Sequence, residues 1–245
     1  MKAAPGIALA VAFSILAAWE ASCRLIPLPD FILPPPSAIA VTAVARAPLL
    51  AANAMVTGLE IVAGIGLALA VAVALATAMF ASRPLERALA PFLIASQAVP
   101  VFAIAPLLVI WFGYGPASKV VMAAVIIFFP ITVSLLEGFK SCDPGYRILF
   151  RLMGASFGRR LRYLYWPWAL PYFFAGLKVG VSVATIGAVI GEWVGSQAGL
   201  GYLMIQANAR LQVDLVFAAI VWLSLMGVGL WALVGLLERR WVYWK

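Results

Sequence analysis

The chain of 245 residues is 65% hydrophobic, has a mean hydropathy of +1.07, and carries 11% charged residues with a net charge of +8. Soluble domains carry about 25% charged residues, so this composition excludes an ordinary soluble protein and predicts an all-α, polytopic membrane protein. The chain has no histidine, which excludes a serine–histidine–acid triad. Its two cysteines are too few to build a metal cluster.

Six apolar runs predict membrane-spanning helices, because a helix needs about 20 mostly apolar residues to cross a bilayer. The first run follows Lys2 and could instead be a signal peptide. Its long apolar core and the poor cleavage site "AWEAS" favour a retained helix. The third run holds Pro91, Pro100 and Pro106, and the fourth holds Pro130. We expect one membrane domain, residues 1–245, with spans at about 5–21, 54–81, 89–112, 120–136, 172–194 and 215–237.

Lysine and arginine predict the orientation, because cytoplasmic loops are enriched in them. Of the 17 such residues, twelve fall in one set of alternating loops and ends, and Lys178 lies inside the fifth run. The other four fall in the outer loops: Arg24, Arg46, Lys119 and Arg210. Both termini are therefore expected in the cytoplasm, and orientation explains the positive net charge without nucleic-acid binding. Cys23 and Cys142 then lie on opposite sides of the membrane, so no disulfide within the chain is expected.

Two outer loops have features of their own. The loop before the second run contains Pro34, Pro35 and Pro36, which favour an extended segment, and residues 37–46 then predict a short helix along the membrane surface. The loop between the third and fourth runs contains "FGYG", which resembles a potassium filter but lacks the preceding Thr-Val. A stand-alone channel or secondary transporter is one alternative, although no convincing internal repeat of the kind usual in secondary transporters is present.

The most polar long segment, residues 140–171, joins the fourth and fifth runs on the cytoplasmic side. Asp143 and Pro144 suit a helix start, because Asp accepts from free backbone N–H groups and Pro fits the first helical position. The helix that follows has an apolar face and a basic face. The apolar face consists of Ile148, Leu149, Leu152 and Met153, and the basic face of Arg147 and Arg151.

The stretch "GASFG", residues 154–158, allows two interpretations. It fits G-x-S-x-G, the nucleophile elbow of serine hydrolases, so an intramembrane hydrolase using Ser156 is the second alternative. No histidine exists to activate that serine, and no lysine lies beside it in sequence. We interpret Gly154, Ala155 and Ser156 as a hinge, in which Gly154 ends the first helix and Ser156 caps a second one to about residue 164. Pro167 and Pro171 are expected to end the segment.

The segment "GASFGRRLRYLYWPWALPYFFAGLKVG" resembles the signature loop of permease subunits of binding-protein-dependent ABC importers. That motif runs Glu-Ala-Ala, three residues, Gly, and about ten residues later a hydrophobic residue before Leu-Pro. Gly154 takes the glycine position, Leu164 the hydrophobic position, and Trp166-Pro167 the Leu-Pro position. Ile148-Leu149-Phe150 replaces Glu-Ala-Ala, so the contact that the motif glutamate makes with its partner is in doubt. The similarity extends to "LPPPSAIA", "FGYGPASKV" and "GSQAGLGYLM".

Within that family the chain resembles the nitrate, sulfonate and taurine group, through "VPVFAIAPLLVIWFGYG" and "IIFFPIT". Together with "IGAVIGEWVGSQAGLGYLMIQANARLQVDL", these segments are most similar to the branch linked to thiamine-precursor pyrimidines. The resemblance implies import of such a hydroxymethylpyrimidine. Import of sulfonate, taurine, nitrate or another heterocycle such as riboflavin by the same machinery stays an alternative.

The resemblance also implies that the protein is part of a type I importer in the bacterial inner membrane. A second permease subunit, expected to be an identical copy, pairs with this one, two ATPase subunits bind inside, and a solute-binding protein delivers solute outside. The chain lacks G-x-x-x-x-G-K-[ST], so ATP and Mg²⁺ belong to the ATPase, and this chain is not an enzyme. The residues expected in the ATPase-coupling loop are Asp143, Arg147, Leu149, Leu152, Met153, Gly154, Ala155, Ser156, Arg159 and Arg160.

Other residues are candidates for packing or for the solute path. Four glycines recur every fourth residue and predict close helix packing: Gly187, Gly191, Gly195 and Gly199. Glu192, beside Trp193, is a carboxylate at membrane depth, where ionisable residues are often functional; a solvated or arginine-paired acid is the other interpretation. Gln97 could offer amide hydrogen bonds to a polar heterocycle, and a role in helix packing is the other interpretation. Glu60, early in the second run, is as ambiguous as Glu192.

Overall fold

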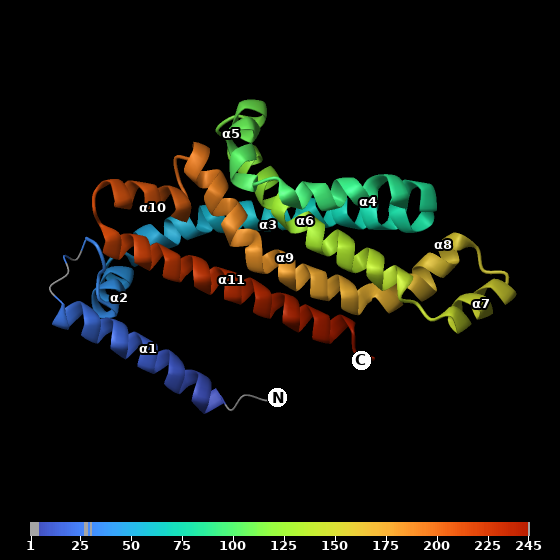
Figure 1. Ribbon diagram of the computed structural model, residues 1–245, viewed down its shortest axis with the longest axis horizontal. Helices are drawn as coiled ribbons and strands as arrows, with labels where there is room; N and C mark the ends of the chain where they lie inside the picture. The colour runs from blue at the N-terminus through green and yellow to red at the C-terminus, as the bar shows by residue number, and fades with distance from the viewer. Residues whose placement is uncertain (1–4, 27–28, 30, 245) are drawn as a thin grey trace.

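The computed structural model describes residues 5–26, 29 and 31–244, and the described secondary structure is helical throughout (Figure 1). This agrees with the all-α class expected from composition. The helices are α1 (Pro5–Leu25), α2 (Pro36–Ala45), α3 (Ala47–Ala81), α4 (Arg83–Ala98), α5 (Val101–Phe112), α6 (Pro116–Lys140), α7 (Pro144–Leu152), α8 (Phe157–Arg160), a π-helical turn η1 (Leu161–Tyr165), α9 (Trp166–Gly195), α10 (Leu200–Ala209) and α11 (Val213–Trp241).

Four helical segments are long and apolar enough to cross a membrane within the described ranges: α3, α6, the continuous segment Phe157–Gly195, and α11. Helices α4 and α5 form a fifth span only if they count as one, and they are bent by 101°. Helix α1 covers the first expected span but is not among these four. The described residues therefore give four or five spans by this measure, where the sequence predicted six.

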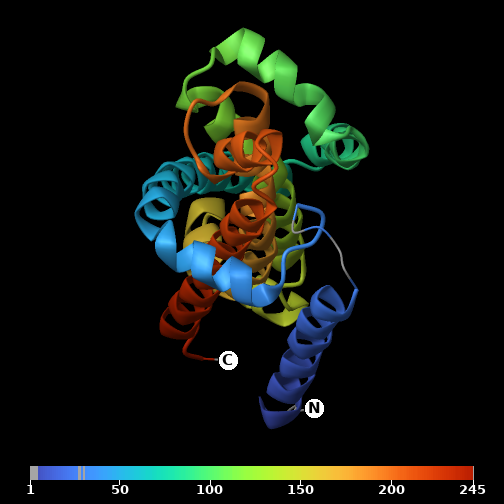
Figure 2. The same cartoon turned by 90° about the vertical axis from the view of Figure 1, so that its left-hand side faces the viewer.

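The expected third span, residues 89–112, consists of two helices, α4 and α5, that bend at Pro100. Val99 and Pro100 are extended, with ψ of 120° and 116°, and the chain turns there. Proline has no N–H to continue the helical ladder, and it disfavours the helical conformation of the residue before it. As a result α5 takes a different direction from α4 (Figures 1 and 2). Its Ala105 and Leu108 are buried against α6 and α9.

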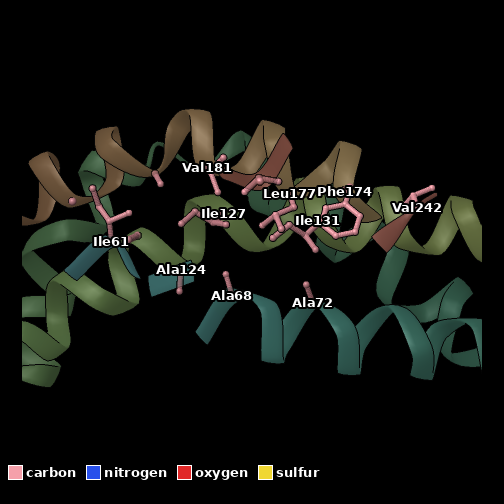
Figure 3. Close-up of a cluster of buried hydrophobic side chains, with 14 residues drawn as sticks. Ile61, Ala68, Ala72, Ala124, Ile127, Ile131, Phe174, Leu177, Val181 and Val242 are labelled. Atoms are coloured by element: carbon pink, nitrogen blue, oxygen red, sulfur yellow. The ribbon is translucent and has the colours of Figure 1, made fainter. Parts of the chain in front are cut away.

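The centre of the bundle is the contact between α6 and α9, with α3 against α6. Figure 3 shows Ile127 and Ile131 of α6 beside Leu177 and Val181 of α9. Glycine lets the two backbones approach closely: a Cβ added at Gly176 would lie 2.6 Å from the Pro130 carbonyl oxygen. Small residues at such contacts are the usual means of close packing in membranes.

The expected surface helix over residues 37–46 corresponds to α2, and it is tied to α1 and α11. The Glu20 carboxylate accepts from Ser37 N at 3.0 Å and from Ser37 Oγ at 2.8 Å, at the start of α2. Thr42 Oγ1 donates to Asp214 Oδ2 at 2.6 Å, at the start of α11. Helix α1 itself lies beside the bundle, on the side opposite α5 (Figures 1 and 2).

Candidate functional site

The expected coupling loop is a separate two-helix unit at one end of the bundle (Figure 1). Its first helix, α7, starts as predicted, because Asp143 Oδ1 accepts from Gly145 N at 2.6 Å. It also ends as predicted. Gly154 has φ of +69°, a conformation that glycine adopts readily, and Ala155 N donates back to the Phe150 carbonyl at 3.0 Å. The hinge at residues 154–156 is therefore confirmed as a turn between helices.

The capping role expected of Ser156 is wrong, although the serine does occupy the N-cap position of α8. Its side chain makes no capping hydrogen bond, and only its carbonyl begins the helix, by accepting from Arg160 N at 2.9 Å. The residues that follow, Phe157, Gly158 and Arg159, are exposed, so water can satisfy their N–H groups. Ser156 therefore adds little to this helix start.

The second helix does not stop near residue 164. Helix α8 continues through η1 into α9, so that Phe157–Gly195 is one continuous helical path. Pro167 lies inside this path, where it cannot donate a backbone hydrogen bond. The π-helical turn just before it takes up the irregularity that the prolines introduce. The second helix of the loop is thus continuous with a helix long and apolar enough to span a membrane.

The apolar face of α7 is exposed, as expected. Leu152 and Met153 are 81% and 70% exposed, and Ile148 and Leu149 are also exposed. Large exposed apolar surfaces of this kind mark contacts with partners. Phe150 lies on the opposite side of α7 and packs against the bundle. Of the three residues that replace Glu-Ala-Ala, Ile148 and Leu149 are therefore exposed and Phe150 contacts the core.

The arginines of the loop separate into two groups. Arg151, in the last turn of α7, and Arg159, on α8, are exposed. Arg147 instead faces its own bundle: its Nη2 donates to the Lys140 carbonyl, and its guanidinium lies 6.0 Å from the centre of the Tyr165 ring. Arg160 is partly buried. Arg147 was expected to contact the partner, and the structure shows it holding α7 to the end of α6.

A buried polar cluster lies near the opposite end of the bundle, where α3, α6, α9 and α10 meet. Glu192 is 1% exposed and bonded on both oxygens: Oε1 accepts from Thr57 Oγ1 at 2.6 Å, and Oε2 from Gly201 N at 2.5 Å. Leu200 N donates to Thr57 Oγ1 at 2.9 Å, and Gly199 N to Asn53 Oδ1 at 2.9 Å. Glu192 is therefore neither solvated nor paired with arginine. It locks the loop before α10 onto α3.

Lys119 was expected in an outer loop, but it is 1% exposed and belongs to this cluster. Its ammonium donates to the carbonyls of Tyr114, Gly115 and Gly195, at 2.5, 3.0 and 2.5 Å. An ammonium has three N–H donors, so all of them are used on backbone groups. Lys119 thus joins the start of α6 to the end of α9. The sequence signal was weak, since Lys119 stands between Ser118 and Val120 in a stretch that reads as a loop.

The four spaced glycines have two different roles. Gly187, Gly191 and Gly195 lie on α9 and allow close packing, as expected: added Cβ atoms would lie 2.9 Å from Ala123 Cα, 3.1 Å from Lys119 Cγ and 2.9 Å from Val109 Cγ2. Gly199 lies beyond the helix, in the loop, with φ of +109°. A Cβ there would overlap the Glu192 carboxylate, so grouping Gly199 with helix packing was wrong.

The candidates for the solute path lie on different elements. Gln97 is exposed on α4, next to the bend into α5, and Trp193 is 43% exposed on α9. Glu192 is buried and bonded within the chain. Glu60 of α3 is 6% exposed and lines a hollow between α3 and α6. No described group of three or more His, Cys, Asp or Glu side chains could hold a metal ion.

Comparison with known proteins agrees with this arrangement. Residues 61–243 match the family described as binding-protein-dependent transport system inner membrane component. The chain is 43% identical to a probable ABC transporter permease protein of Haemophilus influenzae, with 94% of each chain covered. It is 41% identical to a riboflavin transport system permease of Chloroflexus aurantiacus, covering 98% of this chain and 91% of the relative. It is 37% identical to a formylaminopyrimidine transport permease of Halalkalibacterium halodurans, covering 94% and 92%. The chain belongs to the family of binding-protein-dependent inner membrane components: it is the multi-pass permease subunit of an ABC importer, a transport protein and not itself an enzyme.

Proposed function

We propose that this permease moves a small polar heterocycle inward, and that the heterocycle is a thiamine-precursor pyrimidine. The observation that carries the proposal is similarity over nearly the whole chain to two permeases named for heterocycles, formylaminopyrimidine and riboflavin. Riboflavin is the second candidate solute on the same ground. Sulfonate, taurine and nitrate are the remaining candidates.

The proposed machine contains two copies of this chain, two ATPase subunits and an outer solute-binding protein. ATP and Mg²⁺ bind to the ATPase subunits. The exposed apolar face of α7, together with the exposed Arg151 and Arg159, would dock in an ATPase groove with an apolar floor and an acidic rim. The continuous path from α8 into α9 would transmit movement of the ATPase to the bundle.

Uptake by vesicles that contain the complete importer tests the solute. We expect ATP-dependent accumulation of labelled hydroxymethylpyrimidine when the binding protein is present outside, and none without the permease. Riboflavin and an alkanesulfonate serve as parallel substrates in the same vesicles. Accumulation of the sulfonate alone would refute import of a heterocycle.

The proposed orientation places both termini and the coupling loop in the cytoplasm. It rests on the distribution of lysine and arginine. A cysteine introduced as Arg159→Cys should resist a membrane-impermeant maleimide in intact cells and react after permeabilisation. Labelling of that cysteine in intact cells would overturn the orientation.

A further inference from the structure

The segment after α11, residues 242–244, packs onto the end of the bundle that carries the coupling loop. Val242 is 6% exposed and belongs to the central cluster of buried side chains, in which Figure 3 labels it. Its N–H donates to the Glu238 carbonyl at 2.8 Å. Val242 therefore fixes the position of the two aromatic residues that follow, Tyr243 and Trp244, whose ring centres lie 5.1 Å apart.

Trp244 and Trp168 together line two neighbouring hollows. The larger hollow, of about 550 Å³, is completed by Pro171, Tyr172 and Ala175 of α9. The smaller hollow, of about 200 Å³, is completed by Tyr146 of α7, Tyr163 and Leu164 of η1, and Pro167 of α9. Trp168 is held in place between them, because its indole N–H donates to Ser141 Oγ at 3.2 Å.

The two hollows lie on different sides of the expected membrane boundary. Tyr172 and Ala175 of the larger hollow belong to the expected fifth span, residues 172–194, and to a helical segment long and apolar enough to cross a membrane. Tyr146 of the smaller hollow belongs to the polar coupling loop. Tryptophan and tyrosine concentrate where lipid tails meet water. Trp168 and Trp244 therefore lie at the level of the lipid headgroups, with the larger hollow toward the acyl chains.

Arginine supplies positive charge at this level. The Arg162 guanidinium lies 5.5 Å from the centre of the Tyr163 ring, which lines the smaller hollow. Arg239 and Arg240 lie in the last turn of α11. All three arginines are exposed, and no salt bridge joins them to an acid within the described ranges. The neighbouring acid, Glu238, is already neutralised by a lysine of α9. The mouth of the smaller hollow is therefore suited to an anion.

We propose that the two hollows hold one anionic phospholipid. Its acyl chains would lie along Tyr172 and Ala175 in the larger hollow, and its phosphate would lie at the smaller hollow beside Arg162. Basic pockets beside membrane helices bind acidic headgroups, and a zwitterionic lipid offers them no net charge. A soluble protein such as the ATPase cannot enter the larger hollow, because that hollow lies within the span. A lipid is the occupant that fits both hollows at once.

The test measures lipid binding to the detergent-purified permease by native mass spectrometry. Phosphatidylglycerol and phosphatidylcholine with identical acyl chains are titrated in parallel. We expect wild type to bind phosphatidylglycerol at least about fivefold more tightly, since one arginine near a membrane surface contributes about that factor. Arg162→Gln should lose about fivefold in phosphatidylglycerol affinity and bind phosphatidylcholine like wild type. The matched control is Arg87→Gln, the same change at an exposed arginine of α4, which should bind both lipids like wild type.

A second variant tests the larger hollow. Ala175 is exposed and lines it, so the ring in Ala175→Phe would occupy the space of the acyl chains. Both lipids should then bind about tenfold more weakly, because displacing two methylene groups from an apolar site costs about that factor. The control is Ala74→Phe, at an exposed alanine of the membrane helix α3 that lines neither hollow. It should leave the binding of both lipids unchanged.

Three results would overturn the proposal. The first is equal affinity of wild type for the two lipids. The second is the same phosphatidylglycerol affinity in wild type and Arg162→Gln, or the same loss in Arg87→Gln as in Arg162→Gln. The third is release of phosphatidylglycerol by added ATPase subunit, because the hollows would then belong to the contact between the two proteins.

Discussion

Alanine at Gly199 should release the loop that Glu192 holds. Gly199 has φ of +109° and ψ of 163°, and Gly113 has φ of +80° and ψ of −179°. Both conformations belong to a region that is essentially restricted to glycine, where other residues cost about 1–3 kcal/mol. Only Gly199 has a neighbour in the way: an added Cβ would lie 2.5 Å from Glu192 Oε2, whereas nothing lies within 4 Å of one at Gly113.

The difference between the two alanine variants isolates the contact with Glu192. Overlap with the carboxylate must displace it from Thr57 and Gly201, and hydrogen bonds to charged groups contribute about 1.5–3 kcal/mol each. Partial relaxation would recover some of that loss. We therefore expect Gly199→Ala to cost about 2–5 kcal/mol more than Gly113→Ala.

The assay is thermal unfolding of the detergent-purified permease for both variants and wild type. A change of 1 kcal/mol shifts Tm by about 2–4 °C in chains of this length. Gly199→Ala should accordingly melt at least about 4 °C below Gly113→Ala. Equal Tm values would refute the reasoning, because backbone strain alone would then account for both variants.

Two further predictions concern the coupling loop. Gly154→Val should abolish ATPase co-purification and solute-stimulated ATP hydrolysis at normal membrane expression, because a β-branched residue resists the φ of +69°. The control is Gly158→Val, since that position needs no positive φ and has open space for a Cβ. Unchanged coupling in Gly154→Val would contradict the role of the turn. Ser156→Ala should change the unfolding free energy by less than about 0.5 kcal/mol, since its side chain makes no capping bond. Asp143→Ala removes a capping hydrogen bond and should lower the unfolding free energy by about 1 kcal/mol. A larger decrease in Ser156→Ala than in Asp143→Ala would show that Ser156 does cap α8.

The helix starts and ends that were predicted correctly are those that depend on residues close together in the sequence. Asp143 before a proline, Gly154 after an apolar face, and the short helix after Pro36 all depend on a few neighbouring residues. The course of the third span was harder to predict, because it holds three prolines that differ only in context. Pro91 and Pro106 remain inside helices, whereas the chain breaks at Pro100. Neighbouring helices and the surrounding bundle decide which proline bends a segment, and no local pattern contains that information.

The polar cluster was only partly predictable for the same reason. Glu192 stood out as a charge at membrane depth, but its partners Thr57 and Gly201 come from other elements. Lys119 was assigned to a loop by its position between two apolar runs, yet one of its acceptors, Gly195, lies 76 residues away. Burial of a lysine depends on such distant carbonyls, which only the folded chain brings together.

Cross-linking from Leu152 tests the central claim most directly, namely that the exposed face of α7 couples this permease to its ATPase. A photoreactive amino acid is placed at Leu152, which is 81% exposed, or at Ile32, which is 57% exposed in the loop before α2. In membranes containing the complete importer, position 152 should cross-link to the ATPase subunit and position 32 should not. The yield from position 152 should fall when Gly154→Val is added. Cross-linking of the ATPase from position 32, or none from position 152 in an importer that transports normally, would contradict the account.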